Sequence, residues 1–274
     1  MDVFAAKDKV FLLEKRTYIM GILNVTPDSF SDGGQYFKTE DAVAHALQME
    51  AEGADIIDIG AQSTRPGAVP VTAKEEAERL IPVLTALQGK LRVPVSVDTF
   101  FPEVAAQALD AGAAVINDVG GAFQPEIAQA VKACEGGYIV THAPQNADEE
   151  AAYPEGVVPA VRSFFLDVMQ KASDCGLGME HLCLDPGIGF GKSRKDDLEL
   201  LREMQWLKIS PAALLCGASR KRVTAGSDDS PAERDPATLA AHTAAVAGRA
   251  DFLRVHNVKD SRLAAAMADK LYRE

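Results

Sequence analysis

The sequence predicts an α/β protein that forms one closed (β/α)₈ barrel, a TIM barrel, as a single domain over residues 1–274. Three observations lead to this prediction. Short apolar runs that end in polar residues occur eight times, and most lack the alternation of a half-exposed strand; buried parallel strands have this pattern. The segments between them carry apolar residues at intervals of three and four, as amphipathic helices do. The length suits a barrel of this kind, which takes roughly 250 residues.

A strand is expected at each apolar run, and a helix is expected after it. Asp41 and Thr72 stand where helix N-caps are expected, because their side chains accept hydrogen bonds from the first turn. Gly53, Gly112 and Gly176 stand where helices should end, since glycine readily adopts a positive φ angle. The predicted strands are residues 18–24, 54–60, 93–99, 113–119, 138–142, 181–187, 212–219 and 251–256.

The composition excludes several classes of protein. A net charge of −12 argues against nucleic acid or an anionic membrane as the main partner. No apolar run approaches the roughly 18 residues of a membrane span, and residues 1–16 do not resemble a secretory signal. We expect those residues to form a small hairpin or plug at the bottom of the barrel. The four cysteines form no CxxC pair, so a reduced, cytoplasmic enzyme is expected.

Polar residues end the predicted strands, and these ends build the active site of such a barrel. Polar residues also follow strands simply because loops are solvated, but Asp98 ends an otherwise apolar run, where a carboxylate is costly unless it binds something. The set offers acceptors for a flat heterocycle rich in N–H groups, and cations for a phosphate-bearing group. The acceptors are Asp98, Asn117 and Asp185, and the donors are Arg65, Lys221, Arg254 and His256.

Two tempting motifs fail. Residues 187–193 resemble a nucleotide-binding P-loop, but Pro186 occupies the position of the required first glycine. A Ser/His/Asp hydrolase is not supported, because the sequence holds no G-x-S-x-G elbow.

Several blocks of this sequence resemble dihydropteroate synthases. Residues 21–34 (GILNVTPDSFSDGG) are similar to the first signature of that family, and residues 63–67 (STRPG) are similar to the second. The supporting blocks occur in the family's order and spacing over roughly residues 17–260, and are SVDT (96–99), IND (116–118), LDPGIGFGK (184–192), SRK (219–221) and RVH (254–256).

The resemblance implies an enzyme that couples 6-hydroxymethyl-7,8-dihydropterin diphosphate to p-aminobenzoate in folate biosynthesis, releasing pyrophosphate. It implies a homodimer and a Mg²⁺ ion on the diphosphate, held in part by Asn24. The other implied roles are pterin binding by Asp98, Asn117, Asp185 and Lys221; diphosphate binding by Thr64, Arg65, Arg254 and His256; and a p-aminobenzoate pocket formed by Phe30, Pro66, Phe190 and Ser219.

The sequence departs from the family pattern at three places. Ala61 and Gln62 replace the usual Gly-Glu before the second signature, and Thr141 replaces a methionine that lines the pterin pocket. Arg222 follows the SRK block and is either a contact for the aminobenzoate carboxylate or a solvated surface residue. His142 is either a packed histidine at a strand end or a participant in the chemistry.

Two alternatives stay open, of which the departures support the first. The first is a diverged, weakly active paralogue that still binds pterins. The second is the pterin-binding module of a methyltetrahydrofolate–corrinoid methyltransferase, which would not need the loops at 26–34 and 63–65.

Overall fold

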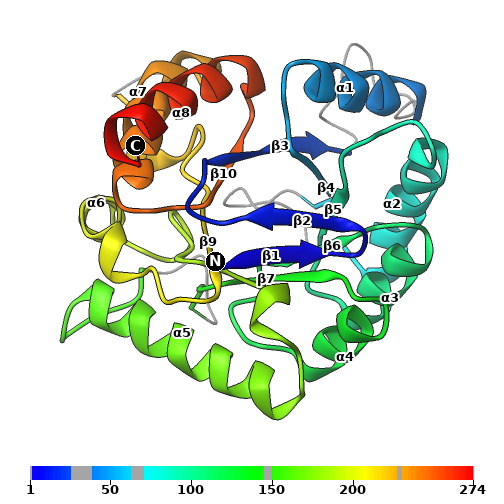
Figure 1. The fold of residues 1–274 in the computed structure, drawn as a ribbon, viewed down its shortest axis with the longest axis horizontal. Helices are drawn as coiled ribbons and strands as arrows, with labels where there is room; N and C mark the ends of the chain where they lie inside the picture. Colours follow the sequence, from blue (N-terminus) through cyan, green and yellow to red (C-terminus); the bar gives the residue numbers. More distant parts are fainter. Residues whose placement is uncertain (1, 26–38, 63–70, 145–149, 227–229, 274) are drawn as a thin grey trace.

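The computed structural model describes residues 2–25, 39–62, 71–144, 150–226 and 230–273. Eight parallel strands close into a barrel in the order β10-β3-β4-β5-β6-β7-β8-β9. Figure 1 shows helices surrounding it. The barrel strands are β3 (Tyr18–Asn24), β4 (Ile56–Gly60), β5 (Val95–Asp98), β6 (Val115–Asp118), β7 (Gly137–Thr141), β8 (Leu182–Asp185), β9 (Ala213–Cys216) and β10 (Phe252–Val255).

The barrel closes where β10 pairs with β3, with Phe252 opposite Tyr18. All eight predicted strands are present, so the predicted fold class is confirmed. Several strands are shorter than their apolar runs, because residues such as Gly187 already belong to the following loop.

The α-helices follow the strands as the sequence predicts. Thr72 is the N-cap of α2, and its side chain shares a capping box with Glu75. Asp41 is not an N-cap: α1 begins at Thr39, so this carboxylate lies in the first turn, where it still interacts favourably with the helix dipole. The helices are α1 (Thr39–Ala51), α2 (Ala73–Leu87), α3 (Pro102–Asp110), α4 (Pro125–Ala133), α5 (Val157–Asp174), α6 (Arg194–Arg202), α7 (Asp235–Ala247) and α8 (Val258–Tyr272).

The three glycines expected to end helices do so. Gly53, Gly112 and Gly176 have φ angles of 101°, 107° and 68° and follow α1, α3 and α5. Short 3₁₀ turns complete the connections, and they are η2 (Met179–His181), η3 (Met204–Trp206), η4 (Arg222–Thr224) and η5 (Ala232–Arg234). No helix in the described part of the chain is long and apolar enough to cross a membrane.

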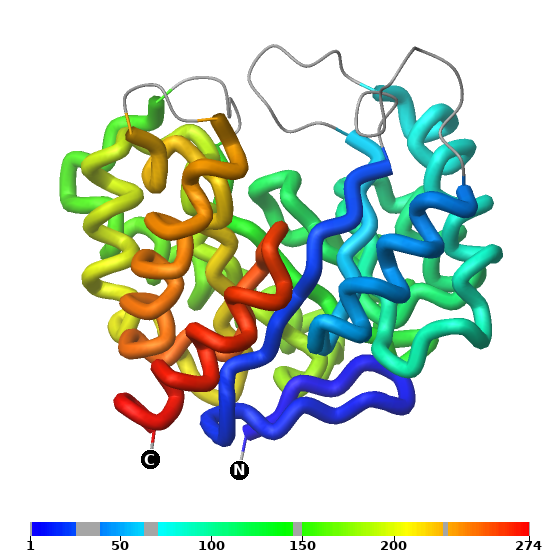
Figure 2. The backbone as a smooth tube through the Cα atoms, turned by 90° about the horizontal axis from the view of Figure 1, so that it is seen from above, coloured from blue at the N-terminus to red at the C-terminus, as the bar shows by residue number. Residues whose placement is uncertain are grey.

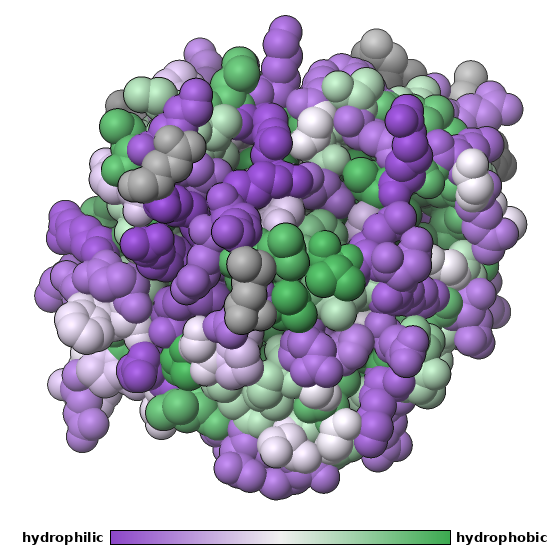
Figure 3. Space-filling model, in the orientation of Figure 1, coloured by the Kyte–Doolittle hydropathy of each residue, from purple (hydrophilic) through white to green (hydrophobic). Residues whose placement is uncertain are grey.

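An N-terminal hairpin covers one end of the barrel. Its strands β1 (Val3–Ala6) and β2 (Lys9–Leu12) are antiparallel, and Figure 1 shows them crossing in front of the barrel. In the side view of Figure 2 the hairpin and both termini lie at one end, and β3 runs away from them. Figure 3 shows a small hydrophobic patch over the hairpin within a largely hydrophilic face.

Aromatic rings join the hairpin to the barrel. Phe4 lies edge-on to Phe252, with 5.4 Å between ring centroids. Phe11 contacts Tyr18 and Phe252, with centroids 5.0 and 5.3 Å away. These rings belong to one buried cluster with the inward-facing side chains of the lower barrel. The hairpin therefore seals this end, and the opposite end is left to carry polar groups.

Replacing Phe4, which is 1% exposed, with alanine is expected to lower the free energy of unfolding by about 3–5 kcal/mol, since the ring leaves a cavity between the hairpin and the barrel. Val10 on the same hairpin is 61% exposed, so Val10→Ala should change stability by about 0.5 kcal/mol or less. Urea denaturation of both variants measures the difference, and equal effects would contradict the sealing role.

Candidate active site

Alternation along the strands directs a set of polar side chains into the barrel. Ile56, Val115, Ile139, Cys183 and Phe252 belong to the buried cluster under the hairpin and therefore face inward. Side chains two residues further along a strand point to the same side. The inward-facing residues at the carboxyl ends of these strands are therefore Asp58, Asn117, Thr141, Asp185 and Arg254.

Arg254 lies at the centre of this set. Its Nε donates to Oδ2 of Asp58 over 2.6 Å, and its Nη2 donates to Oδ2 of Asp98 over 2.7 Å. Asn117 also donates to Asp58 Oδ2, over 3.1 Å. Burial and the neighbouring Asp58 carboxylate raise the pKa of Asp98 to about 7, against the attraction of Arg254. Burial acts to lower the pKa of Arg254, but the two carboxylates together raise it, so Arg254 stays charged.

Four buried polar atoms inside the barrel have no hydrogen-bond partner among the described residues. They are Asp58 Oδ1, Ser96 Oγ, Asn117 Oδ1 and Thr141 Oγ1. Ser96 faces inward because it lies two residues before Asp98 on β5. Buried polar atoms are nearly always hydrogen-bonded in folded proteins. Two of the four accept only, and the hydroxyls can also accept, so these atoms suit a ligand that presents several N–H donors.

Asp185 and Lys221 lie on the far side from Asp58. Asp185 is 5% exposed, and its Oδ1 accepts a hydrogen bond of 2.8 Å from Gly187 N. Lys221 Nζ donates to Ile188 O over 2.5 Å and lies 4.4 Å from the centroid of the Phe190 ring. Burial raises the pKa of Asp185 and lowers that of Lys221, while their mutual attraction opposes both shifts.

Ser219 holds His256 by two contacts. The backbone N–H of His256 donates to Ser219 Oγ over 3.2 Å, and the same hydroxyl lies 2.9 Å from His256 Nδ1. The hydroxyl proton is free to be donated to Nδ1, which leaves the ring proton on Nε2. Burial, with the nearby cations Arg220 and Arg254, lowers the pKa of His256 to about 3. His256 is therefore a neutral donor rather than a cation.

The structure brings together Asp98, Asn117, Asp185, Lys221 and Arg254 around the open end of the barrel, as the strand ends predicted. Asn24 is half-buried at the end of β3, in register with Gly60. Ser219 contacts His256, and Phe190 lies beneath Lys221. Four predicted residues lie outside the described part of the chain: Phe30, Thr64, Arg65 and Pro66.

Three inward-facing residues are missing from the predicted site. Asp58 accepts from Arg254 and Asn117, and Ser96 and Thr141 turn a hydroxyl toward the barrel interior, although Thr141 was noted as a departure. Strand alternation could have identified them, because each stands two positions from a residue whose side chain also faces inward.

His142 points the other way. It follows Thr141 by one position and packs outward against Phe164 of α5, with ring centroids 5.0 Å apart. Burial and Lys192 lower its pKa to about 3. Of the two interpretations left open for His142, the contacts support the packed histidine at a strand end.

The remaining departures have local partners. The Gln62 amide donates to the carboxylate of Glu76 on α2, which is fully buried. The carbonyl of Ala61 accepts from Arg79 over 3.1 Å. Arg222 donates to Lys192 O over 2.6 Å and pairs with Glu150 over 3.1 Å, and both side chains of this pair are 57% exposed. Arg222 therefore contacts other residues of this chain, and its side chain lies at the surface.

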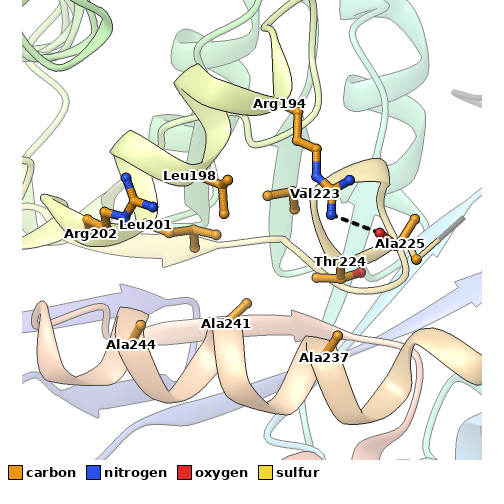
Figure 4. Close-up of a pocket in the computed structure, with 11 residues that line it drawn as sticks. Arg194, Leu198, Leu201, Arg202, Val223, Thr224, Ala225, Ala237, Ala241 and Ala244 are labelled. Carbon is orange, nitrogen blue, oxygen red and sulfur yellow. Dashed lines mark hydrogen bonds between the residues drawn. The ribbon is translucent and has the colours of Figure 1, made fainter.

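A separate cavity of about 500 Å³ lies outside the barrel between α6, η4 and α7. Figure 4 shows Ala237, Ala241 and Ala244 of α7 facing Leu198 and Leu201 across it. Its lining is mostly small and apolar, and it contains none of the inward-facing polar residues. It is therefore distinct from the polar site.

The fold and this site define a pterin-binding (β/α)₈ enzyme, and comparison with known proteins agrees. The family model described as pterin binding enzyme matches residues 20–256. A dihydropteroate synthase from Synechocystis is 44% identical over 94% of this chain and 91% of its own length. Another from Clostridium beijerinckii is 38% identical over 97% and 98%.

Solved structures give the same result. A dihydropteroate synthase from Clostridium difficile, determined in the presence of pteroic acid, superposes with a TM-score of 0.90 at 38% identity, covering 96% of this chain and 100% of that one. The enzyme from Xanthomonas albilineans with 4-aminobenzoic acid gives 0.90 at 39%, covering 98% of each chain. The chain belongs to the pterin-binding enzyme family, and within it to the dihydropteroate synthases.

The lowered pKa of His256 predicts a pH dependence of stability. Between pH 6.5 and about 3 the unfolded chain binds a proton on this histidine that the folded chain does not. Stability is therefore lost as the pH falls through this window, by at most about 1.4 kcal/mol per pH unit for one group. His256→Gln should reduce this slope in urea unfolding at pH 7, 5.5 and 4.5. An unchanged slope would show that His256 is not buried in its neutral form.

Proposed function

We propose that this protein condenses 6-hydroxymethyl-7,8-dihydropterin diphosphate with p-aminobenzoate to give 7,8-dihydropteroate and pyrophosphate, a transferase step of folate biosynthesis. The observation that carries the proposal is the inward-facing ring of acceptors around Arg254. Asp98, Asn117 and Asp185 present carboxylate and amide oxygens at the carboxyl end of the barrel, where Asn117 and Asp185 are buried and the Asp98 side chain is 14% exposed. A reduced pterin offers ring and exocyclic N–H groups that match such acceptors.

The ligands of the relatives support the same chemistry. Pteroic acid, 4-aminobenzoic acid and 7,8-dihydropteroate accompany homologous structures, and they correspond to product-like and substrate parts of this reaction. A sulfonamide complex of the Yersinia pestis enzyme supports sulfonamides as competitors of p-aminobenzoate here as well.

The residues suit a displacement in which the bond to the leaving group breaks early. The exocyclic methylene carbon of the pterin loses pyrophosphate, and the departing oxygen carries the bonding electron pair. Positive charge that develops on the ring is stabilised by the carboxylates of Asp98 and Asp185, which are already in place and largely shielded from water. The arylamine, neutral at pH 7, then forms the C–N bond and loses a proton.

Two donors beside the acceptors suit the leaving group. Arg254 stays charged, and His256 offers an Nε2–H held in place by Ser219. We assign the diphosphate to these two residues, with Thr64 and Arg65, and the aminobenzoate pocket to Phe190 and Ser219, with Phe30 and Pro66. Burial of the barrel interior limits access of water, which would otherwise capture the cation.

Mg²⁺ is proposed as the metal, with Asn24 as a protein ligand. No cluster of three His, Cys, Asp or Glu side chains suited to a metal occurs among the described residues. The half-buried amide of Asn24 fits a Mg²⁺ ion all the same, because this ion commonly takes few protein oxygens and completes its shell with substrate phosphates and water. When bound, it would offset the negative charge of the diphosphate. A homodimer and a cytoplasmic location remain predictions.

Turnover of the pterin diphosphate with p-aminobenzoate, followed as dihydropteroate formation, tests the proposal. Mg²⁺-dependent turnover that EDTA abolishes is expected. Pterin binding without turnover would instead favour the weakly active paralogue, and Thr141→Met would then be the first reversion. Methyl transfer from methyltetrahydrofolate to a corrinoid would favour the corrinoid module.

Asp185→Ala should weaken binding of the pterin roughly 10- to 100-fold, the loss expected for about 1.5–3 kcal/mol from hydrogen bonds to a charged group. Fluorescence titration with 6-hydroxymethylpterin measures it. Asp167 on α5 pairs with Lys171 and is 54% exposed, so Asp167→Ala is the matched control and should bind normally. Normal binding by the Asp185 variant would show that the pterin lies elsewhere.

A further inference from the structure

Lys192 is a buried lysine that the reaction described above does not use. It is 1% exposed and ranks among the largest fully buried side chains. Its Nζ donates to three backbone carbonyls: His142 O over 3.0 Å, Gly187 O over 2.9 Å and Phe190 O over 3.2 Å. A buried ammonium group is costly unless its hydrogen bonds are satisfied, and here three carbonyl oxygens satisfy all three protons.

These carbonyls belong to two segments that meet beside the site. His142 follows β7, and Gly187 and Phe190 lie in the loop between β8 and α6. The contact is close: a Cβ atom at Gly187, whose φ is +68°, would lie 1.9 Å from His142 O. Three carbonyl dipoles that converge with their negative ends repel one another, so a cation between them holds the two segments together.

The same loop positions three residues of the site. Gly187 N donates to Asp185 Oδ1, Ile188 O accepts from Lys221 Nζ, and the Phe190 ring lies beneath that ammonium group. A shift of the loop would therefore move the partners of Asp185 and Lys221 and the ring of Phe190 together.

We propose that Lys192 is a positioning residue for this reaction: its ammonium group fixes the β8–α6 loop so that Asp185 and Lys221 face the pterin and Phe190 faces the aminobenzoate. The inference rests on the proposed function for the identity of these ligands. Lys192 itself touches neither substrate, because its three protons are all donated to the backbone.

The charge state of Lys192 gives the proposal a signature in pH. Burial lowers its pKa to about 8, Asp197, Asp185 and Asp196 oppose the shift, and Lys221 adds to it. The other ionisable groups against it are neutral His142 on the β7 side and Arg222, which donates to the Lys192 carbonyl. A neutral amine would turn a lone pair toward a carbonyl oxygen, so the loop should loosen as the pH rises through about 8.

The test compares Lys192→Met, which keeps the length of the side chain without donors, with Lys195→Met on the exposed side of α6. In protein shown to be folded by circular dichroism, Lys192→Met should weaken 6-hydroxymethylpterin at least 10-fold and raise the KM for p-aminobenzoate by a similar factor. Lys195→Met should match the wild type. Wild-type pterin affinity should fall between pH 7.5 and 9, and this decline should be missing in Lys192→Met.

The proposal would be overturned if folded Lys192→Met bound the pterin as tightly as the wild type. It would also be overturned if the pterin affinity of this variant still declined above pH 8. A variant that only loses thermal stability would overturn it as well, since a purely structural role moves no KM. If Lys192→Met does not fold, Lys192→Ala with added ethylammonium takes its place. We expect the added amine to restore pterin binding in this variant. Failure of the amine to restore binding would count against the positioning role. Pterin binding can be measured without turnover. The turnover assay on the wild type therefore tests the proposed reaction separately from the positioning role of Lys192.

Discussion

The rest of the site depends on the ion pairs of the Arg254 guanidinium with Asp58 and Asp98, in which the Arg254 side chain is 16% exposed. Arg254 lies on β10, and its partners Asp58 and Asp98 lie on β4 and β5, so the side chain must cross the barrel interior beneath the open end. Only closure through the β10–β3 pair brings these strands within reach. Removing one member of such a buried pair costs about 3–5 kcal/mol, because a charge is left without a partner. The same contact therefore stabilises the closed barrel and sets the orientation of the acceptors.

Most residues of the candidate site could be predicted because they lie at the ends of strands, and strand ends are recognised from the local sequence pattern alone. Alternation fixes which side chains enter the barrel, so Asp98, Asn117 and Asp185 could be predicted from their own strands. The hydrogen-bond partners of these side chains could not be predicted. Arg254 was assigned to the diphosphate and Asp98 to the pterin, yet the two are bonded over a separation of 156 residues. Such pairs arise when the barrel closes, and neither strand carries a local signal of the other. The carbonyls around Lys192 were unpredictable for the same reason, since backbone contacts leave no mark on composition.

The departure at Gln62 shows how a local partner explains a changed residue. Glu76 of α2 is fully buried, and burial raises its pKa. A carboxylate at position 62 would face this group with like charge, whereas the Gln62 amide donates a hydrogen bond to it. An amide at 62 is therefore matched to an acid at 76. Thr141 is different, because its hydroxyl has no partner among the described residues. It leaves more room at this position than a methionine would, and it turns a polar group toward the barrel interior.

The charges of the described site explain why a metal fits the proposed reaction. Asp58, Asp98 and Asp185 face Arg254 and Lys221, and His256 is neutral because burial and two nearby arginines lower its pKa. These groups hold no excess of positive charge for a diphosphate. The proposed diphosphate therefore needs positive charge in addition to that of Arg254. A Mg²⁺ ion held in part by Asn24, as proposed above, would supply it at the carboxyl end of β3 and would stabilise the departing pyrophosphate.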